Sequence, residues 1–306
     1  MAHPIRRVLV IHNPVAGRRK RKRLREFLRI LDERGHRTRI CLTKKPGDAC
    51  DVARTTFDVD VIVCAGGDGT VNEVVNGLVA RPERLPLPTL AFLPLGTANV
   101  LAWELDLPAR KAKKMVKQIE NNRVLTVRPG VANGQRFFLM ASVGLDARAV
   151  AAVRPGTKRL FGGGAYVMAA VKALAQPSPS YTVTVDGKSY QAATVIVARA
   201  KHYGGPFVLT PGAGIERNSL TILMINKYGL VPAIRYGAAL VKGTLSTHQD
   251  VQIAIGDTVH IDGPMADPIQ MDGDIKGQLP VAITLDPRPI PFLVRKRFLH
   301  KVDKQY

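Results

Sequence analysis

Hydrophobic residues in the first half of the chain form short apolar runs that alternate with amphipathic segments. Such runs are typical of buried strands, and segments whose apolar residues recur every three or four positions are typical of helices. The alternation predicts an α/β domain built on a parallel sheet. The predicted strands are Arg7–His12, Arg39–Thr43, Val59–Ala65 and Thr89–Leu93. The predicted helices are one that ends near Arg34, then Asp48–Thr55, Val71–Val79 and Arg110–Asn121.

The second half has a different pattern, in which many short strands are separated by turn signals such as Asp186-Gly187, Gly256-Asp257 and Asp272-Gly273. This pattern predicts a sandwich-like β domain. Its predicted strands are Phe137–Val143, Tyr181–Val185, Gln191–Ala198, Leu220–Ile225, Val251–Ile255, Thr258–Ile261 and Pro280–Leu285. Helical patterns interrupt them at Lys158–Ala175 and Val231–Leu245. We therefore expect an α/β domain over residues 1–128, a β-rich domain over 129–290, and a basic tail over 291–306 that could pack back on the first domain.

The composition is that of a globular protein, with 306 residues, 46% of them hydrophobic and 23% charged. No apolar run approaches the roughly 18 residues of a membrane-spanning helix. The three cysteines have neither a disulfide nor a zinc-binding spacing. The apolar stretch near the N-terminus is too short for a signal peptide, so we expect a cytoplasmic protein.

Charge adds the first indication of a partner, since the formal net charge is +21. A field of this sign attracts nucleic acid or the anionic leaflet of a membrane, and by itself it does not choose between them. The excess is concentrated in the segment Arg18–Arg25, where seven of eight residues are cationic. A run of this kind can also be no more than a solvated surface.

The segment most informative about chemistry is Val61–Glu73, in which an apolar strand leads through Gly66, Gly67 and Gly69 into a helix. Glycines allow a ligand to approach the backbone, and a helix N-terminus favours phosphate. Asp68 would repel a phosphate unless it supports Mg²⁺ or handles a proton, so the combination indicates phosphoryl transfer. The alternative is a glycine turn in which Asp68 caps the helix.

Two common nucleotide motifs are absent from the sequence. Gly187-Lys188-Ser189 lacks the upstream glycine of a P-loop, because Thr182 stands in that position. The glycine loop also fails the dinucleotide fingerprint, since Asn72 occupies the place of the third glycine. The loop is therefore a different kind of phosphate loop.

Two segments, Gly66–Val74 and Pro94–Asn99, together resemble the diacylglycerol kinase catalytic domain family, which includes bacterial lipid kinases, sphingosine kinases and ceramide kinases. The first segment alone is also similar to NAD kinases. The resemblance to the lipid kinases extends in order through Asn13-Pro14-x-x-Gly17, Gly144–Ala147, Tyr203–Gly205 and Met271–Asp274, and so spans most of the chain.

This resemblance implies an ATP-dependent lipid kinase, such as one for diacylglycerol or a sphingoid-like lipid, with ATP bound in the cleft between an α/β domain and a β-sandwich domain. The residues expected at the ATP are Asn13, Thr43, Gly66, Gly67, Asp68, Gly69, Thr70, Val71, Asn72 and Thr97. Strand ends at the carboxyl edge of a parallel sheet are also where physical rules place ligands.

The same resemblance suggests that Asp272 takes the proton from the lipid hydroxyl that attacks the γ-phosphate. Without the resemblance, Asp272-Gly273 would be interpreted as a type I′ hairpin turn. Asp68 is the other candidate base, or else it organises Mg²⁺ bound with ATP. The family has Glu where this chain has Asp274.

Three departures from the family pattern remove carboxylates that could support a metal ion. Many bacterial members have Asp at the positions held here by Val100, Arg128 and Asn218. An auxiliary magnesium site of the bacterial diacylglycerol kinase type is therefore not expected, and the assignment of diacylglycerol as substrate weakens.

The expected partners are ATP, a lipid alcohol, and an anionic membrane surface that the Arg18–Arg25 segment would contact at the inner membrane face. Cations at a helix N-terminus are unfavourable because they face the positive end of the helix dipole. An anionic partner would compensate for this repulsion. We expect no nucleic acid, because aromatic residues are only 6% of the chain and form no stacking platform. The sequence is also compatible with a homodimer. The alternatives are an NAD-kinase-like soluble enzyme and a non-catalytic basic protein that binds lipid or nucleic acid.

Overall fold

The computed structural model describes residues 4–16, 20–107, 111–152, 174 and 177–303. The chain divides into two compact units, which comprise residues 1–128 with 287–306, and residues 129–286. The first division lies where the composition changes, after Arg128. The chain returns to the first unit after Asp286, four residues earlier than the expected end of the β-rich domain at 290.

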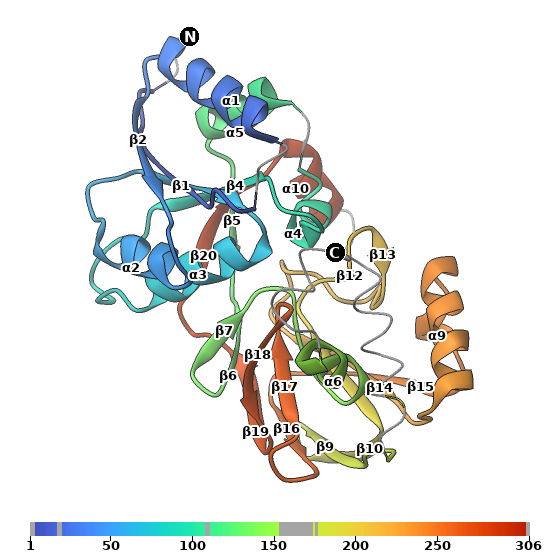
Figure 1. Ribbon diagram of the computed structural model, residues 1–306. Coiled ribbons are helices and arrows are strands. Elements are labelled where there is room, and N and C mark those ends of the chain that lie inside the picture. Colours follow the sequence, from blue (N-terminus) through green and yellow to red (C-terminus); the bar gives the residue numbers. More distant parts are fainter. Residues whose placement is uncertain (1–3, 17–19, 108–110, 153–173, 175–176, 304–306) are drawn as a thin grey trace. The chain divides into compact units, whose positions relative to one another are not determined.

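The first unit is built on a six-stranded sheet with the order β2-β1-β3-β4-β20-β5 (Figure 1). Its strands are β1 (Arg7–His12), β2 (Arg37–Leu42), β3 (Val61–Gly66), β4 (Thr89–Pro94), β5 (Val124–Val127) and β20 (Ile290–Leu293). Neighbours from β2 to β20 pair in parallel, and β5 pairs antiparallel to β20. The α/β fold with a parallel sheet is therefore confirmed.

Helices cover both faces of this sheet (Figure 1). They are α1 (Arg21–Glu33), α2 (Asp48–Thr55), α3 (Asp68–Val79), α4 (Val100–Glu104), α5 (Ala112–Asn121) and α10 (Lys296–Asp303). Helices α1 and α5 bury Phe27, Leu31 and Met115 against alternate residues of β1, β3 and β4. On the opposite side, α2 and α3 pack so closely that a Cβ on Gly77 would lie 2.2 Å from the Cys50 carbonyl oxygen.

The C-terminal segment supplies a strand that the sequence analysis missed. Strand β20 lies between β4 and β5, and Phe292, opposite Leu90, is fully buried. The Arg288 guanidinium, just before it, donates to the carbonyl oxygens of Val79, Pro82 and Leu85. The end of the chain is thus an integral part of the first unit.

The second unit contains two six-stranded sheets with the orders β10-β9-β16-β19-β6-β7 and β15-β14-β11-β8-β17-β18, and a short hairpin, β12-β13. Its strands are β6 (Gly130–Ala132), β7 (Gln135–Phe137), β8 (Met140–Val143), β9 (Tyr181–Val185), β10 (Lys188–Ala192), β11 (Thr194–Ala198), β12 (His202–Tyr203), β13 (Phe207–Val208), β14 (Leu220–Ile225), β15 (Val251–Gly256), β16 (Val259–Asp262), β17 (Pro268–Met271), β18 (Asp274–Gln278) and β19 (Val281–Leu285). A single apolar core draws residues from both six-stranded sheets, as a sandwich requires.

Two of the expected strands are each divided between the two sheets. The run Phe137–Val143 is not one strand, because β7 and β8 belong to different sheets and the chain crosses between them at Phe138 and Leu139. Strands β10 and β11 likewise replace the single strand expected over Gln191–Ala198. A continuous apolar run does not reveal such a crossing, because both sheet faces and the crossing itself are buried.

The described residues of the second unit include the helices α6 (Leu145–Ala152) and α9 (Leu230–Lys242) and the 3₁₀ turn Leu245–Thr247. Helix α9 confirms the helix expected from Val231, although it ends earlier, at a left-handed Gly243. The helix expected over Lys158–Ala175 lies almost wholly outside the described residues. Within the described part of the chain, no helix has both the length and the apolar composition that crossing a membrane requires.

Candidate functional site

The carboxyl ends of four strands meet at one edge of the first sheet. His12 of β1 is in register with Leu42 of β2 and with Ala65 of β3, and Gly66 is in register with Pro94 of β4. The residues that follow these strands therefore lie along the same edge. They include Asn13, Thr43, the Gly66–Thr70 segment and the Pro94–Thr97 segment.

Two glycine-containing segments pack backbone to backbone at this edge. The N–H groups of Leu95 and Gly96 both donate to the Gly66 carbonyl oxygen, at 2.7 and 2.9 Å. A Cβ on Gly96 would lie 2.6 Å from the Gly67 Cα, so any side chain there would force the segments apart. By contrast, a Cβ on Gly69 would meet nothing within 4 Å. The backbone at Gly69 is therefore open to a ligand.

Helix α3 begins at Asp68, earlier than the expected start at Val71. The N–H groups of Thr70 and Val71 return to the Gly67 carbonyl oxygen. Most of the expected phosphate loop is therefore the first turn of a helix, whose earliest N–H groups have no partner within the helix. This is the geometry that favours an anion.

Asp68 does cap a helix, but the helix is α4 rather than its own. Its carboxylate accepts the N–H groups of Val100, at 2.9 Å, and Leu101, at 3.1 Å. Burial raises the pKa of Asp68, and these backbone hydrogen bonds oppose part of that shift. The carboxylate thus connects the glycine segment to the Pro94–Asn99 segment that precedes α4.

The other expected ATP-binding residues differ in how far their side chains are accessible and in what they already bind. The Asn13 side-chain oxygen accepts hydrogen bonds from the N–H groups of Val15 and Ala16 and so forms a turn after β1. Thr43 follows β2 and Thr97 follows β4, and both have part of their surface accessible. Thr70 and Val71 are buried, and their N–H groups already donate to the Gly67 carbonyl oxygen, so neither offers a free side chain or N–H group to a ligand here. Asn72 is half-buried, and both its backbone carbonyl and its side-chain oxygen accept from Asn76.

Two cations at the same edge were not singled out for a role at this loop by the sequence analysis. The Lys20 ammonium donates to the Gly96 carbonyl oxygen at 2.6 Å, and the Arg23 guanidinium donates to the Pro94 carbonyl oxygen at 2.9 Å. Burial lowers the pKa of Lys20, and the nearby Arg23 charge lowers it further. Part of the basic segment therefore supports the Pro94–Gly96 backbone. Arg18 and Arg19 lie outside the described residues.

The described residues do not build a magnesium site of their own. Among them, no three or more His, Cys, Asp or Glu side chains cluster in a way that could hold a metal ion. Both oxygens of Asp68 already accept backbone N–H groups, and Val100 is buried and apolar.

In the second unit, Asp272 and Gly273 form the turn between β17 and β18. Both have positive φ, 50° and 90°, as a type I′ hairpin turn requires. The Asp272 carboxylate accepts the N–H groups of Phe138, Leu139 and Met140 at 2.7–3.1 Å. It therefore satisfies the backbone where the chain crosses between the two sheets, an interaction that no local pattern reveals.

A buried polar network holds the same turn from the other side. The Gly273 N–H donates to the Gln270 side-chain oxygen at 2.8 Å, and the Gln270 amide donates to Ser142 and Asp146. Asp146 also accepts the Tyr203 hydroxyl at 2.5 Å. The motifs Gly144–Ala147, Tyr203–Gly205 and Met271–Asp274 are thus joined by hydrogen bonds within one unit.

Comparisons with known proteins match two successive parts of the chain to two family models. The family model described as the diacylglycerol kinase catalytic domain matches residues 7–132. The model described as the YegS C-terminal NAD kinase beta sandwich-like domain matches residues 140–294. A diacylglycerol kinase of Bacillus subtilis (strain 168) is 28% identical over 282 residues, which cover 90% of this chain and 92% of that protein. A diacylglycerol kinase of Staphylococcus carnosus (strain TM300) is also 28% identical and covers 90% of each chain.

Solved structures share the fold. A crystal structure of a candidate diacylglycerol kinase from Bacillus anthracis (strain Sterne) has a TM-score of 0.80 and 24% identity, covering 95% of this chain and 96% of that one. An NAD kinase from Archaeoglobus fulgidus, in complex with ATP, has a TM-score of 0.53 and 15% identity, covering 98% of each chain. With both family models matched in order, the chain belongs to the diacylglycerol kinase family of kinases, and it joins the catalytic domain to a β-sandwich-like domain.

Proposed function

We propose that this protein is an ATP-dependent lipid kinase that transfers the γ-phosphoryl group of ATP to the hydroxyl of a membrane lipid. The observation that carries the proposal is the junction of β3 with α3, where an open glycine backbone and a helix N-terminus meet at the carboxyl edge of the sheet. The names of the curated relatives support the lipid as acceptor.

In this proposal the first turn of α3 binds the ATP phosphates, since its backbone N–H groups and helix dipole both favour an anion. Asn13, Thr43 and Thr97 would contribute polar groups from the neighbouring strand ends. Lys20 and Arg23 would support ATP binding indirectly, because they donate hydrogen bonds to the carbonyl oxygens of Gly96 and Pro94 and so hold this segment in place. Magnesium would arrive with the ATP phosphates and neutralise their charge.

The transfer itself forms one bond and breaks one. The lipid hydroxyl oxygen bonds to the γ-phosphorus, the bond from that phosphorus to the β–γ bridging oxygen breaks, and ADP leaves. The hydroxyl proton passes to a carboxylate, for which Asp272 is our candidate and Asp68 the other. Because the three N–H groups that Asp272 binds also position it, a role in shaping the turn and a role in accepting the proton require separate tests.

An exposed apolar face of α9 supports a membrane-borne substrate. Leu230, Val231, Ile234 and Val241 lie along this helix with more than half of their surface exposed, and Ile234 is 63% exposed. Arg235 and Lys242 on the same helix are exposed as well. A helix with apolar side chains in water and cations beside them is typical of one that lies in a membrane interface.

The exposed cations of the segment that includes α1 would add an electrostatic contribution. Arg21, Lys22 and Arg25 are exposed, in contrast to Lys20 and Arg23, which are partly buried. Near an anionic leaflet each cation contributes about 1 kcal/mol of attraction. We therefore propose a cytoplasmic enzyme that associates peripherally with the inner membrane face.

The decisive experiment is phosphoryl transfer from labelled ATP to a panel of acceptors in mixed micelles. The panel contains diacylglycerol, a sphingoid base, ceramide, and NAD⁺ as a water-soluble acceptor. We expect labelled lipid phosphate and no labelled NADP⁺. Labelling of NAD⁺ in the absence of lipid would instead support the NAD-kinase-like alternative, and the absence of labelling on every acceptor would support a non-catalytic relative.

A further inference from the structure

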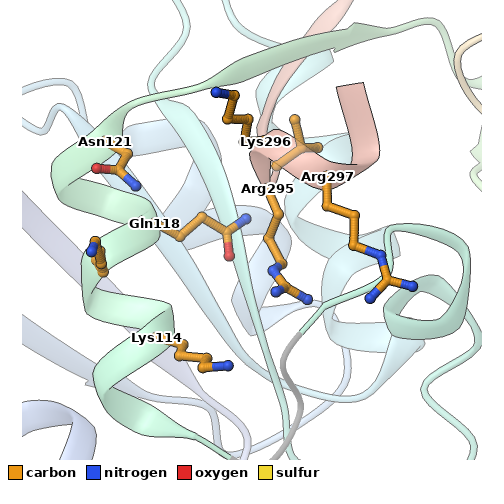
Figure 2. Close-up of a pocket in the computed structure, with 8 residues that line it drawn as sticks. Lys114, Gln118, Asn121, Arg295, Lys296 and Arg297 are labelled. Carbon is orange, nitrogen blue, oxygen red and sulfur yellow. The ribbon is translucent and has the colours of Figure 1, made fainter. Parts of the chain in front are cut away.

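A pocket of about 580 Å³ lies in the first unit, between α5 and the turn that joins β20 to α10 (Figure 2). It is lined by Lys114, Lys117, Gln118, Asn121, Val294, Arg295, Lys296 and Arg297. None of these residues belongs to the glycine segment, and the proposed function gives the pocket no role. Its volume is in the range of small-ligand sites.

Five of the eight lining residues are cations, and none is an acid. Among the described residues, no carboxylate lies within ion-pair distance of Lys114, Lys117 or Lys296, all of which are exposed. Over the ranges that the structure describes, only Arg297 of these five cations has a carboxylate partner, Asp106, at 3.3 Å, and the Arg295 guanidinium donates to the Asp106 carbonyl oxygen at 3.2 Å. A concave surface with several uncompensated cations focuses its field on an anion.

Gln118 adds a neutral polar group to this surface. It is only 4% exposed, and its side-chain nitrogen donates to the Leu293 carbonyl oxygen, which fixes the orientation of the amide. Its side-chain oxygen has no hydrogen-bond partner within the part of the chain that the structure describes. In Figure 2, Gln118 extends from α5 toward Arg295, which projects from the turn before α10. A buried, unpartnered acceptor among cations calls for a ligand that carries a hydroxyl donor as well as a negative charge.

We infer that this pocket binds a phosphorylated polyol, with the phosphate held by the lysines and arginines and a hydroxyl of the polyol donating to the Gln118 side-chain oxygen. The guanidinium of Arg295 suits a phosphate because its fixed fork of N–H groups matches phosphate oxygens. A single strand of nucleic acid fits less well, since the lining has no aromatic side chain on which a base could stack. The phosphorylated polyol could be the headgroup of an anionic lipid such as phosphatidylglycerol, or a free metabolite of the same chemistry.

The test measures binding, and so it does not depend on kinase activity. Titration calorimetry would use glycerophosphoglycerol, the water-soluble headgroup, and inorganic phosphate. Sedimentation would use phosphatidylcholine vesicles with and without phosphatidylglycerol. The pocket variant is Lys114→Gln/Lys117→Gln/Lys296→Gln. Its matched control is Arg84→Gln/Lys111→Gln/Lys113→Gln, which removes the same charge from exposed positions of the first unit outside the pocket.

We expect glycerophosphoglycerol to bind the wild type roughly fivefold tighter than inorganic phosphate, as one additional hydrogen bond provides. The pocket variant should bind it at least about tenfold more weakly, whereas the control should bind like the wild type. Both variants should keep the wild-type Tm.

If the pocket variant also loses its binding to phosphatidylglycerol vesicles, the natural ligand is a lipid headgroup. If it loses only its binding to glycerophosphoglycerol, the ligand is a free polyol phosphate. Equal binding by the pocket and control variants would overturn the proposal, as would tighter binding of a single-stranded RNA that displaces glycerophosphoglycerol.

Discussion

The carboxylate of Asp68, at the first position of α3, accepts the N–H group of Val100, the first residue of α4, at 2.9 Å. This bond joins the starts of two helices that follow neighbouring strands. The same carboxylate also accepts the Leu101 N–H, so it ties the glycine segment of α3 to the first turn of α4. The proposed ATP site is accordingly one hydrogen-bonded assembly rather than a set of independent contacts.

Asp68→Ala should abolish phosphoryl transfer while leaving a folded protein. Loss of a capping side chain costs about 1 kcal/mol, which is small beside the stability of a typical domain. The measurement combines labelled-ATP turnover with urea unfolding. Asp48→Ala is the matched control, because Asp48 also accepts two backbone N–H groups, those of Lys44 and Lys45, outside the glycine segment. If Asp68→Ala retains substantial turnover, Asp68 is only a cap for α4.

The raised pKa of Asp68 gives that variant a defined pH signature. Burial raises the pKa above the ordinary value of 3.8, so the folded state binds the proton more tightly than the unfolded state. Ionisation of Asp68 therefore costs stability, and the cost develops as the pH rises through the raised pKa. The wild type should lose stability relative to Asp68→Ala over that rise. Urea unfolding of both proteins between about pH 3 and pH 7 measures the difference in their free energies of unfolding. If the wild type stays equally or increasingly more stable than Asp68→Ala as the pH rises, burial does not destabilise the carboxylate.

The local patterns of the sequence were sufficient to place the parallel sheet and the residues along its carboxyl edge. Strands that follow one another through helices must be parallel, so Asn13, Gly66 and Thr97 had to lie at the same edge. The first turn of α3 was not placed correctly, because glycine-rich sequence does not indicate that a helix begins at Asp68.

Long-range polar contacts were beyond the reach of the sequence for a different reason. Asp272 binds the N–H groups of residues more than 130 positions earlier in the chain, and Lys20 reaches Gly96 from 76 positions away. Hydrophobic periodicity carries information about a face of a helix or strand, but none about which distant backbone group a carboxylate or ammonium will meet. For the same reason, the basic segment could not be divided into exposed and supporting cations until the fold was known.

Asp272→Asn should keep ATP affinity and lower turnover by roughly 10²-fold or more, the range expected for a group that accepts a proton. Turnover and ATP binding are measured separately, and urea unfolding reports the cost of placing an amide against backbone N–H groups. The matched control is Asp274→Asn, an exposed acid on β18 of the same hairpin. If Asp274→Asn loses most of its turnover while Asp272→Asn stays near normal, Asp274 is the residue that accepts the proton. Asp272 would then only support the turn.

The basic segment should separate into two functions. Lys20→Gln/Arg23→Gln removes the donors to the Gly96 and Pro94 carbonyl oxygens, so it should weaken ATP binding and lower Tm. Lys22→Gln/Arg25→Gln removes the same charge from exposed positions, so it should leave ATP binding unchanged and weaken sedimentation with anionic vesicles. About 0.5 M salt, with a Debye length near 4 Å, should reproduce the second effect in the wild type. If both pairs affect vesicle binding alike and neither affects ATP, the segment serves only as a charged surface.

Ile234→Gln/Val241→Gln on α9 should weaken binding to vesicles and raise the KM for vesicle-borne lipid without changing the KM for ATP. The reason is that both side chains are exposed in water, and their burial in a membrane interface would stabilise the bound state. Ile40→Gln/Leu42→Gln on β2 is the matched control, because these residues expose 49% and 56% of their surface in the first unit. An equal effect of both double variants would indicate non-specific loss of hydrophobicity rather than contact through α9.

Gln270 should act as a positioning residue for the Asp272-Gly273 turn, on the premise of the proposed kinase reaction. Its side-chain oxygen accepts the Gly273 N–H, its nitrogen donates to Asp146, and the residue is only 2% exposed. Gln270→Leu would remove the side-chain acceptor of the Gly273 N–H and one of the donors to Asp146, which also accepts the Ser142 and Tyr203 hydroxyls. Each hydrogen bond lost in this way costs about 1 kcal/mol. We expect lower kcat with an unchanged KM for ATP, because the phosphate-binding segment lies in the other unit.

Gln270→Glu gives the more specific measurement. A glutamate keeps an acceptor for Gly273 but, when ionised, places a second carboxylate against Asp146 in place of a donor. Protonation of either acid restores a donor between them, so the kcat of this variant should recover as the pH falls, while that of the wild type does not. Tyr203→Phe is the control, since it removes a different hydrogen bond to Asp146 and leaves the bond between Gln270 and Gly273 in place. A loss of kcat in Gln270→Glu that is independent of pH and matches Tyr203→Phe would mean that the network stabilises the unit but does not set the geometry of the turn.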